Sequence, residues 1–239
     1  MKQYYSVSET PGRTGYFYYN NFFQHYGIDA VYNPIGIDKD NFLSRFAKIK
    51  ETASGINVSM PYKSEVIKLL DWVDNDVKTY NSCNTIVVDN GKLLGYNTDI
   101  FGVRHVTKGL NKNYSIAILG NGAMGKMFAE YLSQNKYHRV SLVSRSKLNW
   151  NMRNDAFDVI INCTPFGTKN CESPITAVNS QTKIIIDLAV QKGILYDMSV
   201  MAGIAYISGK VFYKHQFLEQ FKIHTGYNID SILYDSVTK

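Results

Sequence analysis

Three short polar clusters in the first hundred residues could bind and protonate a hydroxylated ligand. They are residues 57–63 (Asn-Val-Ser-Met-Pro-Tyr-Lys), residues 84–85 (Asn-Thr) and residues 97–99 (Asn-Thr-Asp). Each cluster falls at the end of a predicted strand or at a strand-to-helix junction, where α/β proteins collect their ligands. The Lys63 ammonium could donate a proton to a developing oxyanion, and the Asp99 carboxylate could orient it. Taken singly, the same side chains could equally be a solvated charge, a helix cap or turn residues.

A glycine-rich segment in the second half of the chain has the spacing of a phosphate-binding turn. Gly120-Asn121-Gly122-Ala123-Met124-Gly125 follows the apolar run 115–119 and opens a segment with helical spacing. In this setting the first glycine permits a tight turn, the second lets the backbone approach a pyrophosphate, and the third lets helix and strand pack closely. Unpaired N–H groups at the start of the helix attract phosphate. The segment predicts a dinucleotide site, against the alternative of a glycine-rich turn that binds nothing.

The end of the next predicted strand indicates which dinucleotide would bind. A protein that binds NAD usually places an acidic residue there, about twenty residues after the glycines, against the ribose hydroxyls. Here the residues are Ser144-Arg145-Ser146-Lys147, without an acid. A guanidinium can hold a 2′-phosphate through two parallel hydrogen bonds, and hydroxyls can donate to it. The sequence therefore predicts NADP rather than NAD, and the alternative for Arg145 is a solvated loop charge.

The elements that must position these residues alternate between strand and helix. Helical spacing is predicted for residues 16–26, with apolar side chains also on one face of 39–48, and Asn90-Gly91 is a hairpin turn between two short strands. Short apolar strands separated by helices predict a parallel sheet covered on both faces, and hence the α/β class. The strands expected in the second half of the chain are 115–119, 140–143, 158–162 and 183–187, followed by a helix over 210–223.

Composition narrows the class of protein further. The net charge is +6 and the pI about 9.0, but the basic residues are spread along the chain, so we expect small anionic ligands and no nucleic acid. Three cysteines, Cys83, Cys163 and Cys171, form no CxxC pair, which argues against a disulfide framework or a metal site. No signal peptide or membrane-spanning apolar run is evident, and a cytoplasmic location is expected.

Taken in order, these motifs resemble the shikimate dehydrogenase family. Its N-V-[ST]-x-P-[FY]-K pattern matches residues 57–63, its V-N-T segment matches 83–85 (Cys-Asn-Thr) and its G-x-N-T-D segment matches 95–99. The glycine turn, the strand-end arginine, the segment 162–167 (Asn-Cys-Thr-Pro-Phe-Gly) and Gly209 with Gln216 follow in the family's order. The resemblance covers nearly the whole chain, and several motifs that agree in order are more specific than any one of them.

The resemblance implies an NADP-dependent oxidoreductase that interconverts 3-dehydroshikimate and shikimate, with Lys63 and Asp99 as its catalytic pair. Two domains with the active site in the cleft between them are expected: a substrate domain of residues 1–101 plus 208–239 and a Rossmann-like NADP-binding domain of residues 102–207. The implied hydroxyl-binding residues are Asn57, Ser59, Asn84 and Gln216. The expected cofactor-binding residues are Gly120, Asn121, Gly122, Ala123, Met124, Ser144, Arg145, Ser146, Thr164, Leu188 and Gly209.

Three positions depart from the family pattern, and the first concerns the carboxylate end of the implied pocket. Counted back from Asn20, the family's Ser-x-Ser falls at Arg13 and Gly15, so Arg13, Thr14 or Tyr16 is expected to take over the carboxylate. A family histidine appears as Tyr19, and a family tyrosine appears as Val190. The chain in these respects resembles the divergent shikimate dehydrogenase-like branch, and shikimate, quinate and aminoshikimate all stay open as substrates.

A second class of function remains open beside the enzyme. The altered Ser-x-Ser positions favour a catalytically weak protein that senses a metabolite and NADP on the same fold. The retention of both Lys63 and Asp99 favours the enzyme, because binding alone requires no proton donor. The protein is expected to be a monomer or a homodimer.

Overall fold

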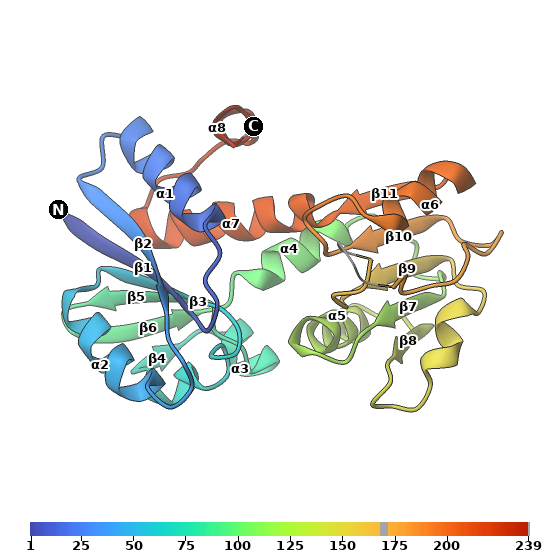
Figure 1. Ribbon diagram of the computed structural model, residues 1–239, viewed down its shortest axis with the longest axis horizontal. Helices are drawn as coiled ribbons and strands as arrows, with labels where there is room; N and C mark the ends of the chain where they lie inside the picture. Colours follow the sequence, from blue (N-terminus) through green and yellow to red (C-terminus); the bar gives the residue numbers. More distant parts are fainter. Residues whose placement is uncertain (168–171, 239) are drawn as a thin grey trace. The chain divides into compact units, whose positions relative to one another are not determined.

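The computed structural model describes residues 1–167 and 172–238, and it confirms the α/β class (Figure 1). The chain divides into two compact units, residues 1–98 with 216–239 and residues 99–215. The domain boundaries expected from the sequence, at 101 and 208, stay predictions. Over the described residues, no helix is both long enough and apolar enough to cross a membrane.

The first unit contains a six-stranded mixed sheet in the order β2-β1-β3-β5-β6-β4. The strands β1, β2 and β3 are parallel, whereas β5 runs antiparallel to both β3 and β6. The predicted hairpin at Asn90-Gly91 is confirmed, since both residues have positive φ angles, 49° and 79°, as the tightest hairpin turns require. The strands are β1 (Lys2–Ser8), β2 (Ala30–Gly36), β3 (Gly55–Val58), β4 (Trp72–Val73), β5 (Thr85–Asp89) and β6 (Lys92–Tyr96).

Helices bury apolar side chains against this sheet. The predicted amphipathic helix is α2 (Phe42–Thr52), which packs Phe42, Phe46 and Ile49 into a core with strand residues such as Ile56. A second core joins α1 (Thr14–His25), α7 (Gly209–Thr225) and α8 (Ser231–Val237) through aromatic rings. Its rings include those of Tyr18, Tyr19, Phe22, Phe23, Phe217, Phe221 and Tyr234. The heavy aromatic content of the chain is thus largely structural.

The stretch after β3 does not begin an α-helix at Pro61. It is a turn that leads into the short 3-10 helix η1 (Val66–Leu69), with α3 (Asn75–Tyr80) further along. The carboxylate of Asp74 caps α3 by accepting from the Val77 N–H at 2.6 Å. The turn keeps the side chains that follow β3 close to the end of that strand.

The second unit contains a five-stranded sheet in the order β11-β10-β9-β7-β8, and every pairing in it is parallel. This confirms the predicted parallel sheet, although β11 was not expected from the sequence. The strands are β7 (Ile116–Leu119), β8 (Val140–Val143), β9 (Val159–Asn162), β10 (Ile184–Asp187) and β11 (Ala205–Ser208). The remaining elements are α4 (Asp99–Val106), α5 (Ala123–Gln134), η2 (Trp150–Asn154) and α6 (Ile194–Ala202).

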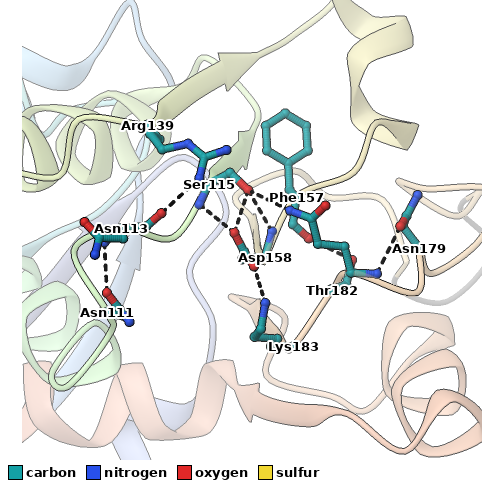
Figure 2. A network of polar contacts seen from close by, with 10 residues as sticks. Asn111, Asn113, Ser115, Arg139, Phe157, Asp158, Asn179, Thr182 and Lys183 are labelled. Carbon is teal, nitrogen blue, oxygen red and sulfur yellow. Dashed lines mark hydrogen bonds and ion pairs between the residues drawn. The ribbon is translucent and has the colours of Figure 1, made fainter.

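A polar cluster ties together the amino ends of three of these strands (Figure 2). The Asp158 carboxylate accepts from both the backbone N–H and the hydroxyl of Ser115, at 2.9 and 2.8 Å, and pairs with the Lys183 ammonium. The hydrogen bond from Lys183 holds the pKa of Asp158 well below its usual range. Because the cluster lies at the amino ends of β7, β9 and β10, opposite the glycine turn, it stabilises the sheet and leaves the carboxyl ends for ligands.

Candidate functional site

A buried hydrogen-bonded network in the first unit begins at Asn57, the third residue of β3. Its amide nitrogen donates to the Tyr32 hydroxyl and to the Gln220 side-chain oxygen, both at 2.8 Å. Burial raises the pKa of Tyr32 to about 12, so this phenol stays protonated at neutral pH. The side-chain oxygen of Asn57 is buried and has no hydrogen-bond partner among the described residues.

The orientation of the Asn57 amide is fixed through Gln220. The Gln220 nitrogen donates to the Asn84 backbone carbonyl at 3.3 Å and to the Thr85 hydroxyl at 2.9 Å. A backbone carbonyl only accepts, so the nitrogen of Gln220 must face Asn84 and its oxygen must face Asn57. The nitrogen of Asn57 must then face Gln220. The network therefore leaves the Asn57 oxygen as the group that can still accept a hydrogen bond.

The network continues through Asn84 to Gln216. The Asn84 side-chain oxygen accepts from the Thr98 backbone N–H at 2.9 Å and from the Thr85 hydroxyl at 2.8 Å. The Gln216 nitrogen donates to the Thr98 hydroxyl at 3.1 Å. Three residues expected to bind hydroxyls, Asn57, Asn84 and Gln216, thus meet in one network.

Sequence reasoning missed two members of this network, Tyr32 and Gln220, whereas Thr85 and Thr98 belong to the polar clusters that the sequence singled out. One signal was available, since Gln216 and Gln220 are four residues apart and therefore share one face of α7. Nothing local marks Tyr32, whose role depends on the pairing of β2 with β1 and of β1 with β3.

Lys63 lies in the turn after β3, in the same unit as the network. Its backbone carbonyl accepts from the Cys83 N–H at 2.8 Å, which ties the turn to the segment before β5. Burial raises the pKa of the Cys83 thiol to about 12, although the positive charge of Lys63 lowers this pKa.

Two other residues of the expected site take no part in this backbone contact. Ser59, in the same turn as Lys63, is exposed, and its backbone N–H donates to the Val7 carbonyl at 2.8 Å. Asp99 is buried at the first position of α4, in the second unit.

The start of α1 carries the residues expected to bind a carboxylate. Arg13 and Thr14 are exposed, and the Arg13 guanidinium lies 5.9 Å from the centre of the Tyr16 ring. Asn20 joins this helix to β2, because its side chain accepts from the Tyr32 N–H at 2.9 Å and donates to the Tyr32 carbonyl at 3.0 Å. Tyr19 stacks on Tyr32, with ring centres 4.3 Å apart, and is fully buried. Tyr19 therefore packs in the core.

The glycine turn of the second unit follows β7 and opens α5, as predicted. Gly120 has a φ of 107°, which a side chain would strain, and a Cβ on Gly125 would lie 1.9 Å from the Gly120 carbonyl oxygen. Gly122 differs, because a Cβ there would meet nothing within 4 Å. No side chain caps the start of α5 at Gly122. Backbone N–H groups at the start of α5 are therefore available to an anion.

A pocket of about 300 Å³ lies against this turn. Six residues from the expected cofactor set line it: Gly120, Asn121, Gly122, Ser144, Arg145 and Thr164. Four further lining residues were not expected: Cys163, Trp150, Pro165 and Phe166. No carboxylate belongs to the described lining. A dinucleotide phosphate fits the donors present, because an open glycine, free helix N–H groups and an arginine converge on one hollow.

The loop after β8 supplies the hydroxyls of this pocket. The Ser144 and Ser146 hydroxyls lie 3.1 Å apart, and the Asn121 amide donates to Ser146 at 3.3 Å. Ala123 and Met124, also expected near the cofactor, are the first two residues of α5. Their roles stay predictions.

Two other expected cofactor residues, Leu188 and Gly209, lie against each other at the start of α7. A Cβ on Gly209 would lie 2.3 Å from the Leu188 carbonyl oxygen, so only glycine fits here. Thr164 is held by Asn162, whose side-chain oxygen accepts from the Thr164 hydroxyl at 2.6 Å. Asn162 donates in turn to Asp187 at the end of β10, at 3.0 Å. These contacts fix the carboxyl ends of β9 and β10 near the residues expected at the nicotinamide.

Two of the three cysteines lie within the described residues. Cys83 and Cys163 are free thiols, and Cys171 lies outside the described residues. Within residues 1–167 and 172–238, no group of three or more histidine, cysteine, aspartate or glutamate side chains could hold a metal ion.

A parallel sheet with a glycine turn between the strand β7 and the helix α5 defines a Rossmann-type nucleotide-binding unit, here in one chain with a mixed α/β unit. The family model described as "Shikimate dehydrogenase substrate binding domain" matches residues 15–86, and the model "Ketopantoate reductase PanE/ApbA" matches residues 116–190. The second match spans β7 to β10, the part of the chain that carries the glycine turn.

Curated relatives agree with the first model. A protein named shikimate dehydrogenase (NADP(+)) from Methanococcus maripaludis is 28% identical over 234 residues, which is 84% of this chain and 82% of the relative. One of the same name from Aquifex aeolicus is 29% identical over 227 residues, 87% of this chain and 84% of the relative. The crystal structure of the Aquifex aeolicus shikimate dehydrogenase matches with a TM-score of 0.87 at 24% identity, covering 100% of this chain and 98% of that one. Over most of its length, the chain is thus similar to proteins named shikimate dehydrogenase.

Proposed function

We propose that this protein is an NADP-dependent oxidoreductase that interconverts 3-dehydroshikimate and shikimate, or a closely related cyclic hydroxy acid. The observation that carries the proposal is the pocket at the glycine turn, where Arg145 takes the place of the acid that would favour NAD. The relatives named shikimate dehydrogenase (NADP(+)) support the same cofactor and the same reaction.

In this proposal the residues of the second unit hold the cofactor. The N–H groups at Gly122 and the start of α5 bind the pyrophosphate, and Arg145 with Ser144 and Ser146 binds the 2′-phosphate. Thr164, Leu188 and Gly209 line the nicotinamide end. A bound reduced nicotinamide supplies the hydride for reduction of a ring ketone.

Lys63 handles the proton in this reaction. As the ketone is reduced its oxygen gathers negative charge, and the Lys63 ammonium stabilises that charge and donates a proton to the oxygen. In the direction of oxidation, the neutral Lys63 amine accepts the proton of the substrate hydroxyl. The proposed role of the Asp99 carboxylate is to orient the ammonium.

The amide network of the first unit is proposed to bind the ring hydroxyls. Asn57, Asn84 and Gln216 provide the amide groups, and Ser59 adds a hydroxyl from the turn after β3. Tyr32 and Gln220 support this role because they occupy the Asn57 nitrogen and leave its oxygen to accept. The hydroxyl groups of a polyhydroxylated ring could donate a hydrogen bond to this buried Asn57 oxygen.

The carboxylate end of the substrate is proposed to lie at the start of α1. Arg13 could pair with a carboxylate as a forked cation, and Thr14 or Tyr16 could add a hydroxyl. Because the family's Ser-x-Ser is replaced, quinate and aminoshikimate stay open as substrates beside shikimate. The replacement also favours the second candidate, a metabolite and NADP sensor with weak turnover.

One assay separates these possibilities. The protein is mixed at high pH with NADP⁺ and, in turn, shikimate, quinate or aminoshikimate, and the absorbance of reduced nicotinamide is followed. We expect reduction with at least one of the three substrates, and faster with NADP⁺ than with NAD⁺. Binding of NADP⁺ without reduction in any mixture would reject the dehydrogenase and leave the sensor.

A further inference from the structure

In the pocket at the glycine turn, Arg145 lies against two aromatic rings that the cofactor motifs do not predict. The guanidinium carbon of Arg145 lies 4.6 Å from the centre of the Phe166 ring and 5.9 Å from that of Trp150. The two rings are themselves 6.0 Å apart. Arg145 is exposed, and the part of the chain that the structure describes offers it no carboxylate partner. Aromatic rings, rather than an ion pair, therefore hold this arginine.

Contacts with residues other than Arg145 hold Trp150 in place. The Arg153 guanidinium lies 5.0 Å from the Trp150 ring, and its nitrogen donates to the Trp150 carbonyl at 3.0 Å. The preceding residue, Asn149, accepts from the Ser144 N–H at 2.9 Å and donates to the Leu142 carbonyl at 3.1 Å. These contacts anchor the start of η2 against the end of β8, so the indole is held beside Arg145.

A guanidinium that is held by aromatic rings can still bind a phosphate, because it is planar and its N–H groups lie along its edge. A guanidinium that lies on ring faces keeps the N–H groups along its edge free, because the rings compete for none of them. An arginine on an exposed loop otherwise loses rotamer freedom when it binds a phosphate, and this loss weakens binding. Ring contacts that hold the arginine beforehand reduce the loss.

We propose that Trp150, together with Phe166, is a positioning residue that holds Arg145 for the 2′-phosphate and so sets the preference for NADP over NAD. The inference rests on the proposed NADP cofactor but names a determinant that the glycine turn and Arg145 alone do not contain. It concerns residues of the second unit only, so it can be tested with fragments of the cofactor.

The test is isothermal titration calorimetry of the full chain with 2′,5′-ADP and with 5′-AMP, which differ in the 2′-phosphate. For Trp150→Leu we expect binding of 2′,5′-ADP to weaken about fivefold, the scale of an exposed cation–π contact, while binding of 5′-AMP changes by less than about twofold. Trp150→Phe, which keeps a ring, should recover most of the preference. Trp72→Leu, at the other tryptophan of the chain, is the matched control and should leave the affinity for both ligands unchanged.

Phe166→Leu should cause the same selective loss, which keeps the proposal testable if Trp150→Leu does not fold. In an Arg145→Ala background, Trp150→Leu should weaken 2′,5′-ADP binding further by less than about twofold, because the arginine that Trp150 positions is gone. Equal weakening of both ligands, or no weakening, would overturn the positioning role while leaving the proposed cofactor intact. A wild-type protein that binds neither 2′,5′-ADP nor NADPH would overturn the cofactor assignment itself.

Discussion

The two polar regions of this protein are built in opposite ways. In the first unit, a network of buried side chains joins residues far apart in the sequence, such as Asn57 and Gln220, which are 163 positions apart. In the second unit, the turn that we propose to bind phosphate is mainly backbone, and the six residues from Gly120 to Gly125 shape it. The first region therefore depends on how helix α7 packs on the sheet, and the second depends on a single strand–turn–helix segment.

The difference explains which region tolerates change. A site made of backbone N–H groups needs only the absence of side chains at Gly120 and Gly125, and it can be carried by chains with little other similarity. A side-chain network needs each donor and acceptor in place, because a buried polar group left without a partner costs stability. We therefore expect substitutions in the first unit to affect substrate and stability together, and those in the second unit to affect the cofactor.

The largest effect is expected at Lys63. Lys63→Ala should lower turnover about 10²- to 10⁴-fold, because the proposed proton donor is lost, while NADP⁺ binding is unchanged. Steady-state kinetics with the best substrate of the assay above, together with calorimetry of NADP⁺ binding, provide the measurement. Lys68→Ala, at an exposed position in η1, is the control. Undiminished turnover would remove Lys63 from the mechanism.

A glycine pair tests whether the second region is a backbone site. Gly125→Ala should lower the free energy of unfolding by about 1 to 3 kcal/mol, since the new Cβ would lie 1.9 Å from the Gly120 carbonyl oxygen. Gly122→Ala has open space and should fold normally, but its methyl group should weaken 2′,5′-ADP binding. Chemical denaturation and calorimetry measure the two effects. Equal stability of both variants would contradict the close approach at Gly125.

The network of the first unit is tested at Gln220. Gln220→Leu removes the donor to the Thr85 hydroxyl and one acceptor of the Asn57 amide nitrogen, and should lower the free energy of unfolding by about 1 to 2 kcal/mol. Substrate binding should weaken as well, whereas 2′,5′-ADP binding should not. Gln24→Leu, at an exposed position on α1, should change neither quantity. An effect of Gln220→Leu on 2′,5′-ADP alone would contradict the separation of the two regions.

The smallest effect concerns the pH dependence of the first unit. Burial lowers the pKa of His224 to about 3, so the folded protein keeps this imidazole neutral while the unfolded chain takes up a proton near pH 6.5. Stability should be full above about pH 6.5 and should fall as the pH drops toward 3, by about 1 kcal/mol between pH 7 and 5.5. His224→Gln should flatten this dependence in urea denaturation, and His25→Gln, at an exposed position, should not. A wild-type stability that is constant over this range would exclude the buried neutral histidine.

Asp158 also makes stability depend on pH, but over a lower range than His224. Asp158 in the second unit has a pKa held below its usual range by Lys183, so its contribution is present above about pH 4 and is lost only at lower pH. The histidine acts through desolvation and the aspartate through its hydrogen bonds, and both make the folded state less stable as the pH falls.

The sequence by itself determined the α/β class, the parallel sheet of the second unit, the hairpin at Asn90-Gly91 and the glycine turn. It also singled out Arg145, which lines the pocket. These features follow from short-range rules, because turn chemistry and strand periodicity are set by neighbours within a few positions. The family motifs added Asn57, Asn84 and Gln216, which the structure joins in one network.

Only the tertiary structure revealed Tyr32, Gln220 and Trp150. Tyr32 and Gln220 reach Asn57 because a parallel sheet and helix α7 bring distant segments together, and Trp150 reaches Arg145 because η2 folds back against β8. Nothing in the local sequence of these residues distinguishes them from ordinary core or surface side chains. Their roles depend on hydrogen bonds and ring contacts between elements, which exist only once the sheets and helices have packed.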